Sequence, residues 1–197
     1  MISDRLAQCL DFLFEIEKLK IVYRQNHVLD GSRQENSAEH SWHIALMAVV
    51  LVEYSDFQNM DLLKIIKMLL LHDVVEIHAG DTFLYDEKAN ELKDKNEALA
   101  ADLIFGLLPV NLKDEFLSLW REFEARKTPE SIFAASLDGL QPLMNHLATK
   151  GAGIANRNIS TSRVIASKKH IADGSAVLWE YAQDVIQQSE TAGLYKK

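Results

Sequence analysis

The sequence predicts an all-α protein, and three observations lead to this fold class. Apolar residues recur at spacings of three and four through nearly every segment of the 197-residue chain, which is the period of one helix face. Residues that commonly cap helices stand just before these segments. No stretch combines alternating strands and helices with a glycine-rich fingerprint, and no internal repeat is present. The length then favours one domain, over residues 1–197.

The N-terminal segment is expected to be a helix followed by a loop. Ser3 precedes apolar residues at helical spacing, which predicts a helix over residues 4–20. Residues 26–36 are polar and contain Asp30-Gly31, a turn signal. We therefore expect a loop from Asn26 to Asn36.

Two apolar helices are expected next. Ser37 is a candidate N-cap for a helix that continues to about Tyr54. Asp61 is a candidate N-cap for the following helix, whose high apolar content predicts that it is central and buried. This helix should end before Gly80.

The second half of the chain also reads as helical. Thr128-Pro129-Glu130 is a helix start, with a capping residue, a proline in the first turn and an acid beside it. The helices expected here cover residues 87–107, 111–126, 129–149 and, after a loop at 151–160, two further segments, the last running from Ser175 to about Ser189. The final residues, GLYKK, are expected to form a loose tail.

Composition excludes several classes of partner. The net charge is −8 without a basic stripe, which argues against a nucleic acid polymer. The longest apolar run, Ile44 to Val52, is too short to span a bilayer, and the N-terminus lacks the apolar stretch of a signal peptide. A single cysteine, Cys9, fits a reducing compartment. We expect a cytoplasmic protein without a membrane partner.

His72 and Asp73 are the first candidates for chemistry. They close the apolar run MLLL, where an unpaired carboxylate would be costly. Glu76 lies three to four residues later, so all three side chains can lean toward one helix face. A metal site is one interpretation; the other is that His72 caps the helix and Asp73 bonds to a neighbouring backbone amide.

Asp138 raises a similar question. It lies in SIFAASLDGLQPLM, an apolar helix with no Lys or Arg within one turn, so its carboxylate must be hydrogen-bonded, paired or coordinating. His40 and His43 lie three residues apart and can share a face, and either could be a ligand. The spacing does not choose between them.

Three segments together carry a resemblance to a known family. They are RQENSAEHSWH (33–43), LHDVVEIHAGD (71–81) and SLDGLQPL (136–143). They resemble the HD-domain superfamily of metal-dependent phosphohydrolases, in the branch that includes bacterial 5′-deoxynucleotidases. The resemblance covers about residues 10–190 and implies a single helical bundle, similar to other HD domains.

The resemblance assigns roles to particular residues. It implies four metal ligands, choosing His40 over His43: His40, His72, Asp73 and Asp138. Glu76 would be the catalytic carboxylate. Asp81 would contact the sugar hydroxyl and help to close the site, and Arg24 would hold the substrate phosphate.

Two positions depart from the family pattern. Gln25 stands where the bacterial 5′-deoxynucleotidases have a tryptophan, which bears on the choice of sugar and base. Gly139 stands where a charged residue is common.

These assignments imply a metal-dependent hydrolase that releases phosphate from nucleoside (deoxynucleoside) 5′-monophosphates. Two imidazoles and two carboxylates favour Mn²⁺ or Co²⁺ over Ca²⁺, with Ni²⁺, Zn²⁺, Fe²⁺ and Mg²⁺ as alternatives. The resemblance also implies a homodimer. One alternative keeps the metal but changes the substrate, to a cyclic nucleotide, an alarmone or a non-nucleotide monoester. Another is a metal-binding helical module without turnover.

Overall fold

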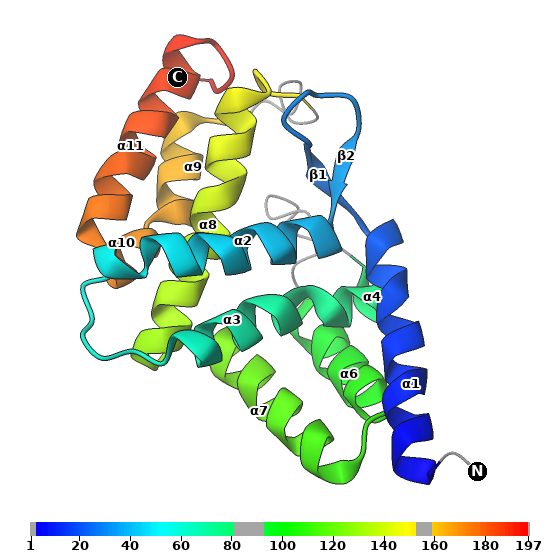
Figure 1. The fold of residues 1–197 in the computed structure, drawn as a ribbon. Coiled ribbons are helices and arrows are strands. Elements are labelled where there is room, and N and C mark those ends of the chain that lie inside the picture. The colour runs from blue at the N-terminus through cyan, green and yellow to red at the C-terminus, as the bar shows by residue number, and fades with distance from the viewer. Residues whose placement is uncertain (1–2, 81–92, 153–158, 197) are drawn as a thin grey trace.

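The computed structural model describes residues 3–80, 93–152 and 159–196. Within these ranges helices build nearly all of the fold, beside one small two-stranded sheet, so the prediction of an all-α protein is confirmed. Figure 1 shows α2 (Ser37–Leu51) and α3 (Leu62–Leu71) crossing the long helix α8 (Pro129–Ala148). No helix in the described part of the chain is both long and apolar enough to cross a membrane.

Helix α8 is the centre of the fold. It packs against α2 and α3 from the first half of the chain. It also packs against three helices from the second half: α7 (Val110–Ala125), α10 (Ile171–Gly174) and α11 (Ala176–Thr191). Phe133, Leu137 and Leu140 on this helix are almost completely buried. A polar residue on α8 therefore has few routes to water and must find partners in the protein.

The chain begins with α1 (Asp4–Ile16), followed by a 3₁₀ turn, η1 (Glu17–Ile21). Ser3 caps α1, because its side chain accepts a hydrogen bond from the backbone N–H of Leu6. The predicted helix over residues 4–20 is thus confirmed, with its last turn tightened to 3₁₀.

The loop predicted over residues 26–36 is wrong at both ends. Strand β1 (Tyr23–His27) pairs antiparallel with β2 (Gln34–Asn36), and only the connection between them is a loop. The strands are short and polar, so no alternation of apolar residues signals them. Backbone pairing holds them together, and the side-chain amide of Gln34 adds a 2.9 Å hydrogen bond to the carbonyl of Arg24.

Helix α2 starts one residue differently from the prediction. Asn36, not Ser37, is its N-cap, and it forms a capping box with Glu39. A 3₁₀ turn, η2 (Val52–Tyr54), completes the segment near the predicted end. Ser37 is free for another contact, described below.

The helix predicted from Asp61 to Gly80 is interrupted. Asp61 does cap α3, but α3 ends at Leu71 and a 3₁₀ turn follows, η3 (His72–Val75), before α4 (Glu76–Ala79). Gly80 ends this stretch with a φ of +79°, a conformation that glycine adopts without strain. The interruption falls on the His72–Asp73 pair.

The second half follows the predicted order with one addition. Thr128 caps α8 and Pro129 occupies its first turn, as predicted. The start of the helix predicted at residue 87 lies outside the described residues. The observed helices are α6 (Lys93–Phe105), α7 (Val110–Ala125), α8, α9 (Thr161–Lys168), a short α10 (Ile171–Gly174) and α11 (Ala176–Thr191).

The C-terminal tail is docked, in contrast to the prediction. The backbone N–H of Lys196 donates to the carbonyl of Ile159, and the N–H of Thr161 donates to the carbonyl of Lys196. The ring of Tyr195 stacks on His146 at a centroid distance of 4.7 Å. The tail therefore closes the upper end of the bundle in Figure 1.

Candidate metal centre

His72 lies where α3 changes into the 3₁₀ turn η3. Its Nδ1 atom lies 2.9 Å from the backbone carbonyl of Leu69, which can only accept, so Nδ1 carries the proton and Nε2 is left for another partner. His72 is also the C-cap of α3, so the capping role considered above is present together with an Nε2 that faces the carboxylates of the site. A 3₁₀ stretch within a helix is a frequent mark of a functional segment.

Asp73, the next residue, turns its carboxylate toward charged groups. Its Oδ1 lies 3.0 Å from His72 Nε2, and its Oδ2 accepts a 2.6 Å hydrogen bond from Arg24 Nη1. Arg24 reaches this position from strand β1, so the hairpin that the sequence did not reveal carries the arginine to the site.

His40 enters from the first turn of α2 and is completely buried. Its Nε2 lies 3.0 Å from Asp138 Oδ1, and its Nδ1 lies 3.1 Å from Gln141 Oε1. Asp138 and Gln141 both come from α8. The capping box at Asn36 fixes the helix turn from which the imidazole projects.

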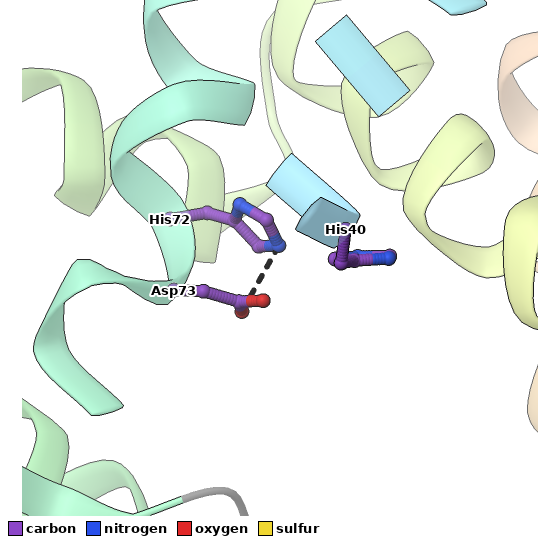
Figure 2. A group of neighbouring side chains, drawn as sticks. All are labelled: His40, His72 and Asp73. Carbon is purple, nitrogen blue, oxygen red and sulfur yellow. Dashed lines mark ion pairs between the residues drawn. The ribbon is translucent and has the colours of Figure 1, made fainter. Parts of the chain in front are cut away.

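These side chains converge on one point. His40, His72 and Asp73 offer ligand atoms that all lie within 4.8 Å of one another, and Figure 2 shows His40 beside the ion pair of His72 and Asp73. Asp138 is outside that group of three, but its Oδ1 lies 3.0 Å from His40 Nε2 and 3.7 Å from His72 Nε2. The arrangement is a potential His/Asp metal site.

The donor chemistry fits a divalent ion. Two imidazole nitrogens and two carboxylates suit first-row transition ions. The buried Nε2 of His72 makes no hydrogen bond of good geometry to any described residue, although Asp73 lies close to it. An ion would supply the partner that this atom lacks.

Burial and charge set the protonation of the site. Burial, helped by the charge of Arg24, lowers the pKa of His40 to about 4, so its imidazole is neutral at pH 7. Burial also disfavours the charged form of His72, but the Asp73 and Asp138 carboxylates outweigh it and raise the pKa of His72 well above 6.5. Burial raises the pKa of both Asp73 and Asp138, but the positive charges of His72 and Arg24 outweigh it at Asp73, and contact with the charged His72 outweighs it at Asp138, so the pKa of each carboxyl lies below its ordinary value. The two ionised carboxylates therefore attract positive charge. His72 and Arg24 supply such charge, and a bound metal ion would supply more.

Glu76 lies one turn beyond Asp73, at the start of α4, and is 6% exposed. Its Oε2 accepts a 2.7 Å hydrogen bond from the hydroxyl of Ser37, the residue released from the capping role on α2. Asp81, the other candidate carboxylate, lies outside the described residues. His43, the alternative ligand, faces Gln141 at 3.4 Å and is not in the group of three.

Several residues around the site were not predicted from the sequence. Ser37 and Arg24's strand are examples, and Gln141, fully buried on α8, is another. Gln141 lies three residues after Asp138, so it shares a face with it, and a glutamine in an apolar helix could have signalled this. Lys168 at the end of α9 also interacts electrostatically with the site. Burial lowers the pKa of Lys168 to about 8, while the charge of the Asp138 carboxylate opposes this shift.

Pro142 changes the backbone hydrogen bonding of α8 at Asp138. It lies inside α8 and has no backbone N–H, so the carbonyl of Asp138, four residues earlier, loses its usual helical donor. The carbonyl of Pro142 accepts a 3.1 Å hydrogen bond from Asn26 on β1. The helix and the hairpin are therefore joined beside the site.

Comparisons with known proteins agree with this arrangement. The HD domain family model matches residues 16–179. The chain is 32% identical over 136 residues to human 5′-deoxynucleotidase HDDC2, covering 68% of this chain and 65% of that protein. It is 29% identical over 144 residues to the Dictyostelium discoideum protein of the same name, covering 71% and 76%. The chain thus spans about two thirds of the length of the human relative.

Solved structures show the same fold. A predicted metal-dependent phosphohydrolase from Magnetospirillum magnetotacticum MS-1 has 40% sequence identity and a TM-score of 0.91, with 99% of this chain and 100% of that chain covered. The PH0347 protein from Pyrococcus horikoshii OT3 has 23% identity and a TM-score of 0.66, with 93% and 99% covered, and supports the fold alone.

Proposed function

This chain belongs to the HD domain family, and from that premise we propose that it is a metal-dependent phosphohydrolase. Its substrates in this proposal are nucleoside 5′-monophosphates, deoxynucleotides included, which it converts to nucleoside and phosphate. The observation that carries the proposal is the convergence of His40, His72 and Asp73, with Asp138 against both imidazoles. The relatives are 5′-deoxynucleotidases by name, which supports the substrate class.

The four proposed ligands are His40, His72, Asp73 and Asp138. When bound, the divalent ion supplies a Lewis acid that polarises the phosphoryl group. The nitrogen and oxygen donors favour Mn²⁺ or Co²⁺ over Ca²⁺. Burial keeps His40 neutral and therefore able to offer a lone pair.

Arg24 is proposed to hold the substrate phosphate. Its guanidinium already lies 2.6 Å from Asp73 at the site. Guanidinium has five N–H donors, so Arg24 can keep this contact and still present others to phosphate oxygens. Its positive charge would thereby neutralise negative charge on the phosphate, which the surrounding carboxylates cannot do.

Glu76 is proposed as the general acid or base. It can take a proton from the attacking water or give one to the leaving ribose oxygen. The hydroxyl of Ser37 donates a 2.7 Å hydrogen bond to one oxygen of its carboxylate and so holds the side chain in place. Asp81 is proposed to contact the sugar hydroxyl, as the family resemblance implies.

The proposal extends to the assembly, the location and the substrate preference of the protein. We propose a single domain that acts as a homodimer in the cytoplasm, where a reduced Cys9 would be at home. The sugar and base preference rests on Gln25, which replaces the tryptophan of the bacterial enzymes. A smaller and more polar side chain at that position would relax the discrimination between ribose and deoxyribose.

The test is a phosphate-release panel with protein stripped of metal and reloaded with Mn²⁺ or Co²⁺. The panel holds 5′-monophosphates of ribo- and deoxyribonucleosides, 3′-monophosphates, cyclic nucleotides, an alarmone and p-nitrophenyl phosphate. We expect release from the 5′-monophosphates and none from the stripped protein. Preferred turnover of another ester would overturn the substrate, and inactivity of the loaded protein on the whole panel would overturn the enzymatic proposal.

A further inference from the structure

A chain of buried polar side chains lies behind His40, on the side away from Asp138. Gln141 Oε1 lies 3.1 Å from His40 Nδ1, and Gln141 Nε2 donates a 2.8 Å hydrogen bond to Glu35 Oε1. All three residues are buried, with His40 and Gln141 at 0% exposure and Glu35 at 4%. Burying a carboxylate and an amide away from solvent costs free energy unless hydrogen bonds compensate, and here the hydrogen bond between Gln141 and Glu35 satisfies one oxygen of the carboxylate.

The contacts determine which way the amide of Gln141 points. The carboxylate of Glu35 accepts a hydrogen bond from the NH₂ group, and His43 Nδ1 lies 3.4 Å from the same nitrogen. Both hydrogens of the NH₂ group therefore have acceptors, and the carbonyl oxygen is turned toward His40. With the amide reversed, its NH₂ group would meet the imidazole and its oxygen would meet a carboxylate.

The amide orientation in turn selects the tautomer of His40. A carbonyl oxygen only accepts, so His40 Nδ1 must carry the proton. The lone pair then lies on Nε2, which faces Asp138 Oδ1 at 3.0 Å. Two acceptor atoms at this distance repel each other unless a cation lies between them, which is the state that a metal site requires.

We propose that Gln141, held by Glu35, is a positioning residue that fixes the His40 tautomer for metal binding. This inference rests on the proposed function and adds to it the residues that prepare one ligand. Gln141 lies on α8 with Asp138, so one helix provides both a ligand and the group that orients a second ligand. Glu35 lies on β2 directly before α2, so the hairpin, α2 and α8 meet in this network.

The experiment measures Co²⁺ binding to metal-stripped protein by titration, together with the visible absorption spectrum of bound Co²⁺. We expect Gln141→Leu to weaken Co²⁺ affinity by about 10- to 100-fold, the usual effect of removing the partner of a metal-bound histidine, and to change the spectrum. Asn145→Leu is the matched control, because Asn145 also contacts Glu35, at 3.4 Å, from the same helix, whereas the helix residue that contacts His40 Nδ1 is Gln141. The control should change affinity by less than about 3-fold, since it leaves the His40 contact intact.

A swapped pair separates this role from loss of packing. The double variant Glu35→Gln/Gln141→Glu keeps an acceptor toward His40 and keeps a hydrogen bond between the two side chains. It moves the negative charge from residue 35 to residue 141. This double variant should recover most of the affinity that Gln141→Leu loses, whereas the single Gln141→Glu variant, with two adjacent carboxylates, should not. Circular dichroism and the Tm of each stripped variant report whether it is folded.

A second measurement needs no substitution. In Zn²⁺-loaded protein labelled with ¹⁵N-histidine, His40 should show a protonated Nδ1 and a metal-bound Nε2. A metal-bound Nδ1, or unchanged Co²⁺ affinity and spectrum in Gln141→Leu, would overturn the inference and leave the proposed function standing. If the unmodified protein binds neither ion, the proposed function and the inference both fail.

Discussion

Two buried histidines of this protein differ in their partners but not in their burial. His40, in the candidate metal centre, is completely buried, and both ring nitrogens face a polar atom, Gln141 on one side and Asp138 on the other. His146, at the far end of α8, is 3% exposed, and neither ring nitrogen has a hydrogen bond to a described residue. Burial lowers the pKa of both to about 4.

The comparison teaches that burial sets the protonation of a histidine, while its neighbours set its role. His146 stacks on Tyr195 from the docked tail, with planes inclined by 16°, and acts as a flat packing surface. His40 has acceptors on both sides and only one proton to offer when neutral, so one side is prepared for a cation.

Removing the carboxylate beside the two imidazoles should have the largest effect. In Asp138→Ala we expect loss of bound metal and a fall in turnover of about 10⁴-fold or more, because the ion and its electrostatic stabilisation disappear together. Metal content by mass spectrometry and phosphate release check this. Asp114→Ala, which removes an exposed carboxylate from α7, is the control. Full metal occupancy in Asp138→Ala would mean that Asp138 is not a ligand.

Removing the proposed general acid or base should separate catalysis from metal binding. Glu76→Ala should lower turnover by about 10³-fold, within the range for such a group, while metal content stays unchanged. Ser37→Ala, which removes the hydroxyl that holds Glu76, should lower turnover less and also spare the metal. Loss of metal in Glu76→Ala would contradict the division of roles.

His146 should make stability fall in acid. The pKa of His146 is about 4 in the folded state and about 6.5 in the unfolded state, so the unfolded state binds more protons between these values. The contribution of neutral His146 to the free energy of unfolding is therefore fully present above pH 6.5, and it is lost as the pH falls toward 4. His146→Phe keeps the stack on Tyr195 and removes this dependence, by about 2 kcal/mol between pH 7.5 and pH 5.

Denaturant unfolding of both proteins across this pH range measures the difference. The comparison between the two proteins matters more than either curve, because other histidines titrate in both. Equal pH dependence in the two proteins would mean that His146 has a proton acceptor after all.

A side chain at Gly139, the residue after Asp138, should destabilise the protein. A Cβ there would lie 2.6 Å from His170 Nε2, so Gly139→Ala should lower the free energy of unfolding by about 1–2 kcal/mol through overpacking. The effect should shrink in a His170→Ala background, as measured by a double-mutant cycle of unfolding free energies. Equal destabilisation in both backgrounds would assign the cost to something other than His170. This contact also accounts for glycine at a position where the family often has a charged residue.

Much of the fold was predictable because the signals are local. Ser3, Asp61, Thr128 and Ser175 were expected at helix starts, and each does cap its helix. The hairpin was missed because its strands are polar and are held by pairing between backbones, and the tail was missed because its partners lie far away in the chain. The break at His72 was missed because the apolar pattern continues across it.

The candidate site divides in the same way. The residues that bear ligand atoms stood out as polar groups in apolar segments, and the family resemblance grouped them. Ser37, Glu35 and Gln141 did not stand out, because each acts on a side chain from another element. Their roles depend on contacts between residues far apart in sequence, which no local pattern records.

Local sequence patterns were enough to predict a helical protein with histidine and aspartate side chains set into apolar helices. Helix periodicity, capping and the cost of burying a charge act over a few residues, so they can be read along the chain. Tertiary packing was needed to bring His40, His72 and Asp73 to one point, to carry Arg24 there on a hairpin, and to place Gln141 against His40. The reason is that packing α8 against α2 and α3 brings together groups whose hydrogen bonds are made across the core.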